Sequence, residues 1–165
     1  MATEKKNLSV YDKASIPEAQ GLRIGIVVSE WNHEITHNLY QGALDALLDC
    51  GVSKEEIYKL DVPGSFELIY GAKYIFNEVK PHAIIVLGSV IRGETAHFDF
   101  VCQGVSNGVA DLNIQLPVPV IFGVLTDDNE EQAKARSGGK HGNKGTECAI
   151  AAIKMANLNS YKSGS

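Results

Sequence analysis

The chain contains the segment Ala83-Ile-Ile-Val-Leu-Gly-Ser-Val-Ile-Arg-Gly-Glu-Thr-Ala-His97, which joins an apolar run to a glycine turn and a helix start. The run at residues 83–87 predicts a strand that is buried on both faces. A turn with free backbone N–H groups directly before a helix is where α/β folds bind anions. His97 ends the turn, and histidine is the residue type that transfers protons near neutral pH. The segment therefore predicts a phosphate-binding turn beside an acid–base group.

Short apolar runs alternate with helical patterns on both sides of this segment. Strands are predicted at residues 22–28, 57–62, 83–87 and 118–124. Helices are predicted at residues 35–50 before Gly51, at 68–79 with Ser65 as cap and Pro81 as stop, at 97–116, from an Asp127-Asp128 cap to Arg136, and at 146–158. A loop rich in glycine and lysine is expected at residues 137–145. This order predicts a doubly wound, four-stranded parallel sheet in a three-layer α-β-α sandwich.

The composition is that of an ordinary globular protein. The 165 residues suffice for one domain, which we expect at residues 21–158, between a flexible polar arm at 1–20 and a polar tail at 159–165. Hydrophobic residues make up 44% and charged residues 21% of the chain. The net charge of −5 argues against nucleic acid or an acidic membrane surface as a partner.

The cysteines indicate neither a disulfide framework nor a metal site. Cys50, Cys102 and Cys148 are far apart, and none stands in a CxxC or Cys/His spacing that would bind zinc. No signal peptide is recognisable at the start, and no apolar run is long enough to span a membrane. We therefore expect a cytoplasmic protein without a metal.

Several residues with possible chemistry follow the predicted strands, where α/β folds bind their ligands. Trp31 follows the first strand, residues 64–67 the second and residues 92–97 the third. Each has an ordinary alternative interpretation: Thr95 as a helix cap, Phe66 as a core residue, and His97 as a surface histidine. Arg136 is either a solvated charge or a side chain that donates two parallel hydrogen bonds to a phosphate group.

Taken together, five segments resemble one enzyme family. They are Trp31-Asn-His-Glu-Ile-Thr36, Val62-Pro-Gly-Ser-Phe-Glu67, Gly88-Ser-Val-Ile-Arg-Gly-Glu-Thr-Ala-His97, Pro119-Val-Ile-Phe-Gly123 and Gly142-Asn-Lys-Gly145. In order and spacing they resemble the 6,7-dimethyl-8-ribityllumazine synthase family over about residues 20–158. The resemblance implies a flavodoxin-like fold and the condensation of 5-amino-6-(D-ribitylamino)uracil with 3,4-dihydroxy-2-butanone 4-phosphate, with release of phosphate and water. It implies no metal or other cofactor.

The resemblance also implies a role for each matching residue. His97 matches the catalytic proton carrier, and Glu94, Thr95 and Arg136 match the site for the butanone phosphate. The residues that match the pyrimidine site are Trp31, Ser65, Phe66, Glu67, Ser89, Val90, Ile91, Phe122 and Lys144. Of these, Phe122 is implied to come from a neighbouring subunit, and Lys144 either contacts the ring or pairs with Glu147.

The implied assembly is a homo-oligomer with active sites between subunits, either a pentamer or an icosahedral 60-mer. The short loop at residues 137–142 favours the shell, and riboflavin synthase is a candidate partner. The chain departs from many members of the family at Trp31, where they have phenylalanine, and at Glu94, where they have a small residue. The alternative from another class is a non-catalytic flavin-binding or storage protein of the same fold, which would need neither His97 nor Arg136.

Overall fold

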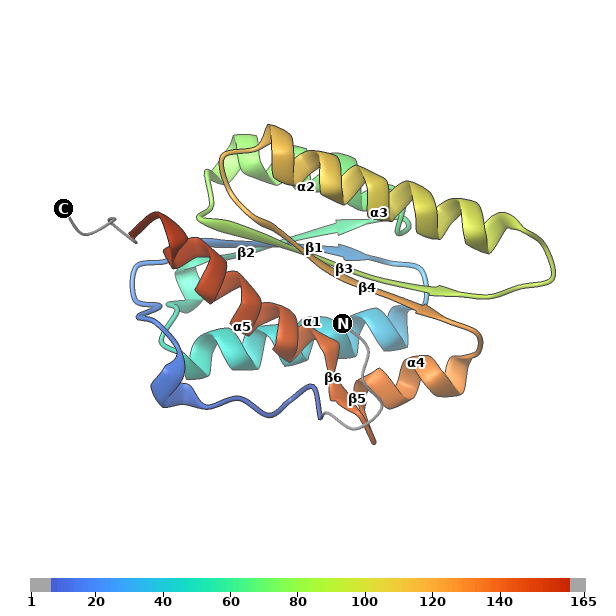
Figure 1. The fold of residues 1–165 in the computed structure, drawn as a ribbon, viewed down its shortest axis with the longest axis horizontal. Helices are drawn as coiled ribbons and strands as arrows, with labels where there is room; N and C mark the ends of the chain where they lie inside the picture. The colour runs from blue at the N-terminus through green and yellow to red at the C-terminus, as the bar shows by residue number, and fades with distance from the viewer. Residues whose placement is uncertain (1–6, 161–165) are drawn as a thin grey trace.

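The computed structural model describes residues 7–160 and confirms the predicted three-layer α-β-α sandwich with a flavodoxin-like arrangement (Figure 1). The four-stranded sheet is parallel and has the order β2-β1-β3-β4. Its strands are β1 (Ile24–Ser29), β2 (Ile57–Val62), β3 (Ala83–Ile91) and β4 (Val120–Asp127). The two outer strands are β2 and β4, so β4 is an edge of the sheet.

The helices cover both faces of the sheet. They are α1 (His33–Asp49), α2 (Leu68–Val79), α3 (His97–Gln115), α4 (Glu130–Arg136) and α5 (Lys144–Ala156), with short 3-10 turns at Lys13–Ser15, Lys54–Glu56 and Asn157–Ser160. Figure 1 shows α2 and α3 on one face and α1, α4 and α5 on the other. The predicted loop after α4 contains a small antiparallel hairpin, β5 (Ser137–Gly139) and β6 (Gly142–Asn143).

The core consists of two apolar clusters, one on each face of the sheet. On the α1 and α5 face, Leu39, Leu47 and Ile153 are fully buried against the sheet. On the α2 and α3 face, Leu68 and Val105 are fully buried. Strands β1 and β3 contribute to both clusters, because helices cover both sides of these central parallel strands. This explains why their sequences are continuous apolar runs.

Two predicted helix caps are wrong. Ser65 does not cap α2, since the residue before this helix is Glu67 and no side chain caps it. The Asp127-Asp128 pair does not cap α4 either, because the side chain of Asn129 accepts the hydrogen bond from Gln132 N at 3.0 Å. Strand β4 extends past its predicted end and includes Asp127, which is buried.

Two other helix ends are determined by a glycine and by a side-chain cap. Gly51 follows the last residues of α1 with a φ of +97°, a left-handed conformation that glycine adopts without strain. Helix α5 begins at Lys144, earlier than the predicted start at Thr146, because the Asn143 side chain accepts a hydrogen bond from Gly145 N at 2.8 Å.

The segment before β1 contacts the domain from Asn7 onward. Leu8 N donates to His141 O at 2.8 Å, Tyr11 donates through its hydroxyl to Asp49 at 2.8 Å, and Ala19 is buried in the core. Residues 1–6 of the expected arm and 161–165 of the expected tail lie outside the described residues. Among residues 7–160, no helix combines the length and the apolar character needed to cross a bilayer.

Candidate active site

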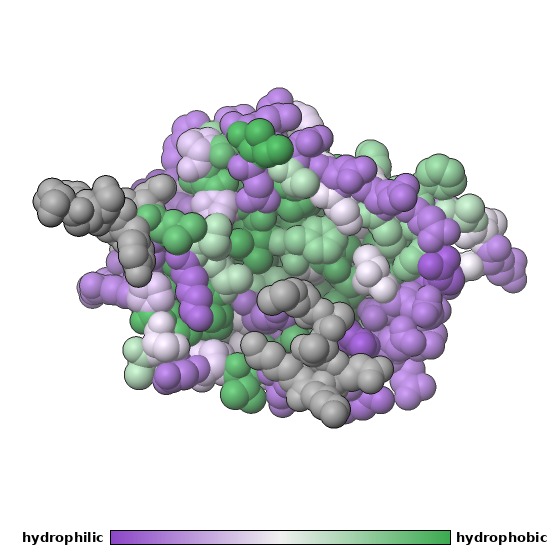
Figure 2. Space-filling model, viewed as in Figure 1, coloured by the Kyte–Doolittle hydropathy of each residue, from purple (hydrophilic) through white to green (hydrophobic). Residues whose placement is uncertain are grey.

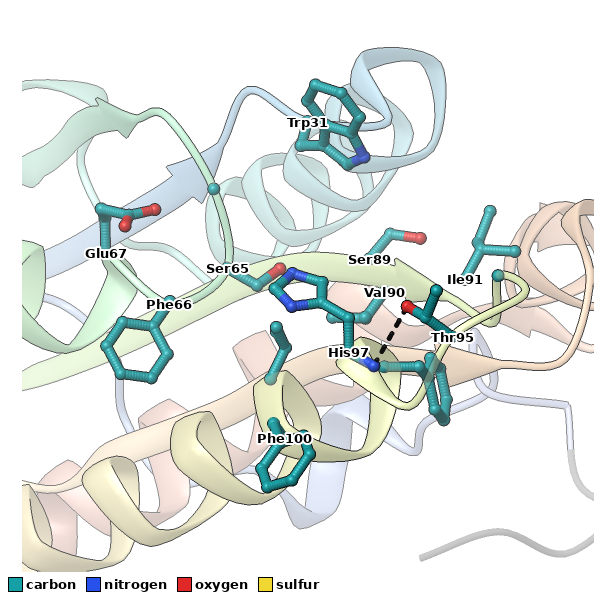
Figure 3. Close-up of a pocket in the computed structure, with 14 residues that line it drawn as sticks. Trp31, Ser65, Phe66, Glu67, Ser89, Val90, Ile91, Thr95, His97 and Phe100 are labelled. Carbon is teal, nitrogen blue, oxygen red and sulfur yellow. Dashed lines mark hydrogen bonds between the residues drawn. The ribbon is translucent and has the colours of Figure 1, made fainter.

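A cleft of about 590 Å³ opens at the carboxyl ends of the strands, the edge at which the sequence predicts ligand binding (Figure 3). Three turns that follow β1, β2 and β3 form its walls, together with the first turns of α3. The lining residues are Trp31, Gly64, Ser65, Phe66, Glu67, Ser89, Val90, Ile91, Gly93, Thr95, His97, Phe98, Phe100 and Val101. Most of the predicted site residues therefore lie around one cavity.

The turn after β1 presents Trp31 at the mouth of the cleft. Asn32 has a left-handed backbone with a φ of 58°, and its side-chain amide donates to Ser89 O at 2.9 Å. Trp31 N donates to Pro63 O at 3.2 Å. The backbone of this turn is thus fixed to the two neighbouring turns, while the Trp31 side chain remains exposed.

The turn after β2 brings Phe66 and Ser65 to the cleft through close contacts with two glycines. A Cβ atom at Gly104 would lie 2.6 Å from Phe66 Cε2, so only glycine lets the Phe66 ring lie against α3 there. A Cβ at Gly88 would lie 2.6 Å from Ser65 Oγ, so Ser65 packs directly over β3. Phe66 keeps 54% of its surface exposed, which leaves its ring available to a ligand.

The turn after β3 carries His97 at the first position of α3. The backbone N–H of His97 donates to Thr95 Oγ1 at 3.3 Å, and Figure 3 shows the imidazole ring directed toward Ser65 inside the cleft. Phe100 and Val101 lie one turn further along the same face of the helix. Sequence reasoning missed them, although their spacing of three and four residues from His97 is a usable signal.

Arg92 lies in the same turn, but its charge is already paired. Its Nε donates to Asp128 at 3.1 Å, its Nη2 lies 3.2 Å from Asp99, and its guanidinium covers the Phe98 ring at 4.2 Å. The hydrogen bonds to Asp128 and Asp99 raise the pKa of Arg92 above its usual value. No lysine or arginine lines the cleft in the described part of the chain. A lysine or arginine that pairs with a phosphate group bound in the cleft would therefore have to come from another surface.

Four predicted site residues do not line this cleft. Phe122 is partly buried on the edge strand β4, and Glu94 is exposed outside the lining. Lys144 pairs with Glu147 at 2.9 Å, which is one of the two alternatives left open by the sequence. Arg136 lies at the end of α4, beside a separate hollow of about 310 Å³. That hollow is lined by Asn129, Glu131, Gln132, Ala135, Arg136, Lys140 and His141.

The described residues offer no cluster of three or more histidine, cysteine or acidic side chains that could hold a metal ion. The cysteines are poor nucleophiles, because burial raises the pKa of the Cys148 thiol to about 12 and also raises the pKa of Cys50 and Cys102. Among the described residues that line the cleft, His97 is the only histidine, and Glu67 is the only carboxylate.

Comparison with known proteins identifies the same enzyme family along nearly the whole chain. The sequence model described as 6,7-dimethyl-8-ribityllumazine synthase matches residues 21–160. A protein of that name from Christiangramia forsetii is 64% identical over 159 residues, which cover 96% of this chain and 95% of the relative. A Flavobacterium johnsoniae relative is 63% identical over 94% of this chain and 82% of its own length. The Porphyromonas gingivalis relative is 54% identical over 96% of this chain and 98% of its own length. Both carry the same name.

Proposed function

Because the chain belongs to the 6,7-dimethyl-8-ribityllumazine synthase family, we propose that the His97 cleft is the part of the active site that one subunit supplies. The protein is an enzyme, a transferase of riboflavin biosynthesis. It condenses 5-amino-6-(D-ribitylamino)uracil with 3,4-dihydroxy-2-butanone 4-phosphate to 6,7-dimethyl-8-ribityllumazine, and it releases phosphate and water. The relatives support this reaction, and none of those reported supports the flavin-storage alternative.

The pyrimidine substrate binds against the aromatic side chains of the cleft. Trp31 and Phe66 offer exposed flat rings on which a heteroaromatic ring can stack. Backbone groups of Ser65 and of residues 89–91 bind the edge of the pyrimidine. The carboxylate of Glu67 accepts hydrogen bonds from the ribityl hydroxyl groups. The cleft thus recognises one flat group and one polyol chain.

His97 transfers protons during the condensation. The amine of the pyrimidine attacks the ketone and forms an imine, phosphate leaves, and the second nitrogen closes the ring. Loss of water from the attacked ketone needs a proton donated to the departing oxygen. The departure of phosphate needs a proton taken from the neighbouring carbon, and ring closure needs a proton taken from nitrogen, so both steps need a proton acceptor. The imidazole ring directed into the cleft can donate and accept these protons, and holding the two substrates together contributes the remaining acceleration.

One observation carries the proposal that two subunits form each site. The cleft has no cationic side chain in its lining, while Arg136 and Phe122 of the same chain lie on other surfaces. We infer that a neighbouring subunit supplies Phe122 to the pyrimidine and Arg136 to the phosphate. The backbone N–H groups of Glu94 and Thr95 bind the other side of the phosphate.

Mixing two variants of low activity tests this arrangement. His97→Ala and Arg136→Ala subunits are unfolded together, refolded as a mixture, and assayed for phosphate release at low butanone phosphate. If each site combines His97 of one subunit with Arg136 of the next, about a quarter of the sites in an equimolar random mixture regain both groups. A mixture no more active than the average of the two parents, with mixed assemblies verified by mass spectrometry, would show that one subunit supplies both residues.

The assembly we propose is the pentamer, with twelve pentamers packed into an icosahedral shell. Large apolar side chains on and beside α2 and α3 remain exposed, as expected of an interface: Phe66, Tyr70, Tyr74, Phe100 and Ile114. Figure 2 shows hydrophobic residues gathered over the middle of the face on which the edge strand β4 lies. The hairpin at residues 137–143 is short, and the family resemblance links a short segment at this place to members that form shells.

Light scattering at neutral pH checks the size of the assembly. We expect particles of the mass of a complete shell, about twelve times the mass of a pentamer. Tyr70→Lys places a charge in the apolar surface of α2, and it should lower the mass of the particles without unfolding the subunit. A sample in which only pentamers or decamers are present would contradict the shell.

We also propose a cytoplasmic location and an interaction with riboflavin synthase. The first is supported by the three free thiols of Cys50, Cys102 and Cys148, which suit a reducing compartment. The second rests on the family resemblance, and co-sedimentation of the two purified proteins tests it.

A further inference from the structure

Asp127, the last residue of β4, is a buried carboxylate that its surroundings only partly satisfy. Its exposed fraction is 5%, and its Oδ2 atom has no hydrogen-bond partner among the described residues. Burial raises the pKa of this carboxyl above its usual value, although Arg136 opposes the shift. A buried charge without full hydrogen bonding costs stability, so the fold alone does not explain a carboxylate at this position.

The cationic group that pairs with this carboxylate is the guanidinium of Arg136. Arg136 Nη1 lies 3.8 Å from Asp127 Oδ1, and the same nitrogen donates to Gln132 O at 3.1 Å. Gln132 is itself fixed, because its backbone N–H donates to Asn129 and its side-chain oxygen accepts from Asp128 N, both at 3.0 Å. The Nη1 end of the guanidinium is therefore held against a rigid part of α4.

The other edge of the guanidinium has no such contact. Within residues 7–160, the structure gives no hydrogen bond or ion pair to Arg136 Nε or Nη2. The N–H bonds of these two nitrogens point in the same direction along one edge of the planar guanidinium. Together they can donate two parallel hydrogen bonds to two oxygens of a phosphate group. The side chain is also only 30% exposed, which limits the directions it can take.

We propose that Asp127 is a positioning residue: it holds the Nη1 end of Arg136, so that the Nε–Nη2 edge faces the phosphate of the butanone substrate. The inference rests on the proposed role of Arg136 and extends it. Asp127 touches neither substrate, and its negative charge acts only through the arginine. An arginine held in this way loses less side-chain freedom on binding phosphate, which strengthens binding of that substrate alone.

Asp127→Asn is the decisive variant, because it keeps the shape of the side chain and removes its charge. The assay uses the full chain in its native assembly and measures separate Michaelis constants for the two substrates. We expect the KM for the butanone phosphate to rise about three- to tenfold, with the KM for the pyrimidine and kcat within about twofold of the wild type. The melting temperature should stay the same or rise, since a buried, partly satisfied charge is removed.

Asp128→Asn is the matched control. Asp128 is the next residue, but it is exposed and its side chain pairs with Arg92 instead of Arg136. This variant also loses one negative charge at the same edge of the sheet. It should leave the KM for the butanone phosphate within about twofold of the wild type, because the charge lost is screened by solvent.

A second comparison separates positioning from a structural role. In an Arg136→Ala background, Asp127→Asn should cause no further rise in the KM for the butanone phosphate. An equal rise with and without Arg136, an unchanged KM in the single variant, or a lower melting temperature with both substrates weakened would each overturn the inference. If Arg136→Ala alone leaves that KM unchanged, then the proposed phosphate role of Arg136 fails first, and the inference fails with it.

Discussion

The turns that follow the neighbouring strands β3 and β4 lie side by side, yet they lead to functional side chains on different surfaces of the subunit. Ile91 and Asp127 are paired in register at the ends of the two strands, and Arg92 N donates to Asp127 O at 2.9 Å. The first turn directs His97 into the cleft, whereas α4 after the second turn carries Arg136 to a separate hollow. Proximity of two strands in one subunit therefore does not bring their functional side chains into one site.

The difference between the two turns follows from the layers that receive them. The first turn leads to α3, which covers the same face as α2 and borders the cleft. The second leads to α4, on the face of α1 and α5 (Figure 1). The chain thus carries His97, the proposed acid–base group, and Arg136, the proposed phosphate-binding residue, on opposite sides of its sheet. We infer that only contact between copies unites these two groups.

The largest effect is expected from removing the acid–base group of the first turn. His97→Ala should lower turnover by about 100- to 10,000-fold, the usual contribution of a positioned proton donor and acceptor. Some activity should remain, since the imine can form without a catalyst. Steady-state formation of the lumazine product, with thermal unfolding measured alongside, gives the result.

His37→Ala is the control for this variant, because His37 is an exposed histidine on α1 that does not line the cleft. It should keep near wild-type turnover. If the His97 variant folds normally and is as active as the control, His97 is not the proton carrier. The turn after β3 then has no catalytic role to set against the role of Arg136 after β4.

Removal of the arginine beside the second turn should act on one substrate. Arg136→Ala should raise the KM for the butanone phosphate by about 10- to 100-fold, since a charge-assisted fork to phosphate is lost. The KM for the pyrimidine should change much less. Lys134→Ala removes a positive charge from the same helix, where the side chain pairs with Glu130, and serves as the control. Equal weakening of both substrates would indicate that Arg136 merely stabilises the end of α4.

Sequence patterns predicted the fold wherever apolar residues repeat regularly. The run at residues 83–87 and the alternation around it predicted the right layers and the right number of strands in the parallel sheet, because burial on both faces leaves few alternatives for such a sheet. Sequence patterns failed where polar residues determine where a strand ends and the next helix begins. Asp127 was predicted as a helix cap because acidic residues favour that position, but the strand continues through it. The β5–β6 hairpin consists of glycine and polar residues, so it has no apolar alternation to reveal it.

The sequence predicted the residues around the cleft better than it predicted the position of Arg136, the proposed phosphate-binding residue. The residues around His97 follow consecutive strands, and strands of a parallel sheet end at one edge, so the chain order alone brings them together. Phe122 and Arg136 have the right chemistry, but their distance from the cleft depends on the face each side chain occupies on or beyond β4. The buried environment of Asp127 depends on the packing of α4, which no local pattern in the sequence specifies.

The smallest effect expected is optical, and it concerns the mouth of the cleft opposite His97. Trp31 is the only tryptophan of the chain, so indole fluorescence reports on this place alone. Trp31 is 72% exposed in the subunit, while its backbone N–H is bonded to Pro63 O. If a heteroaromatic ligand stacks on it, emission should be quenched, because the two ring systems come into contact. Riboflavin or a non-reactive pyrimidine analogue serves as the ligand.

The titration must distinguish stacking on Trp31 from absorption of light by the ligand and from binding without stacking, which could also change the emission. Free tryptophan titrated with the same ligand corrects for light that a flavin absorbs without binding. Inorganic phosphate has no ring to stack, so it should leave the emission unchanged even where it competes with the butanone phosphate. Saturable quenching that disappears in Phe66→Ala would place the ligand between the two aromatic side chains, since Phe66 lines the same cleft. Unchanged emission at a ligand concentration that inhibits turnover would instead mean that Trp31 covers the end of the sheet and does not touch the substrate.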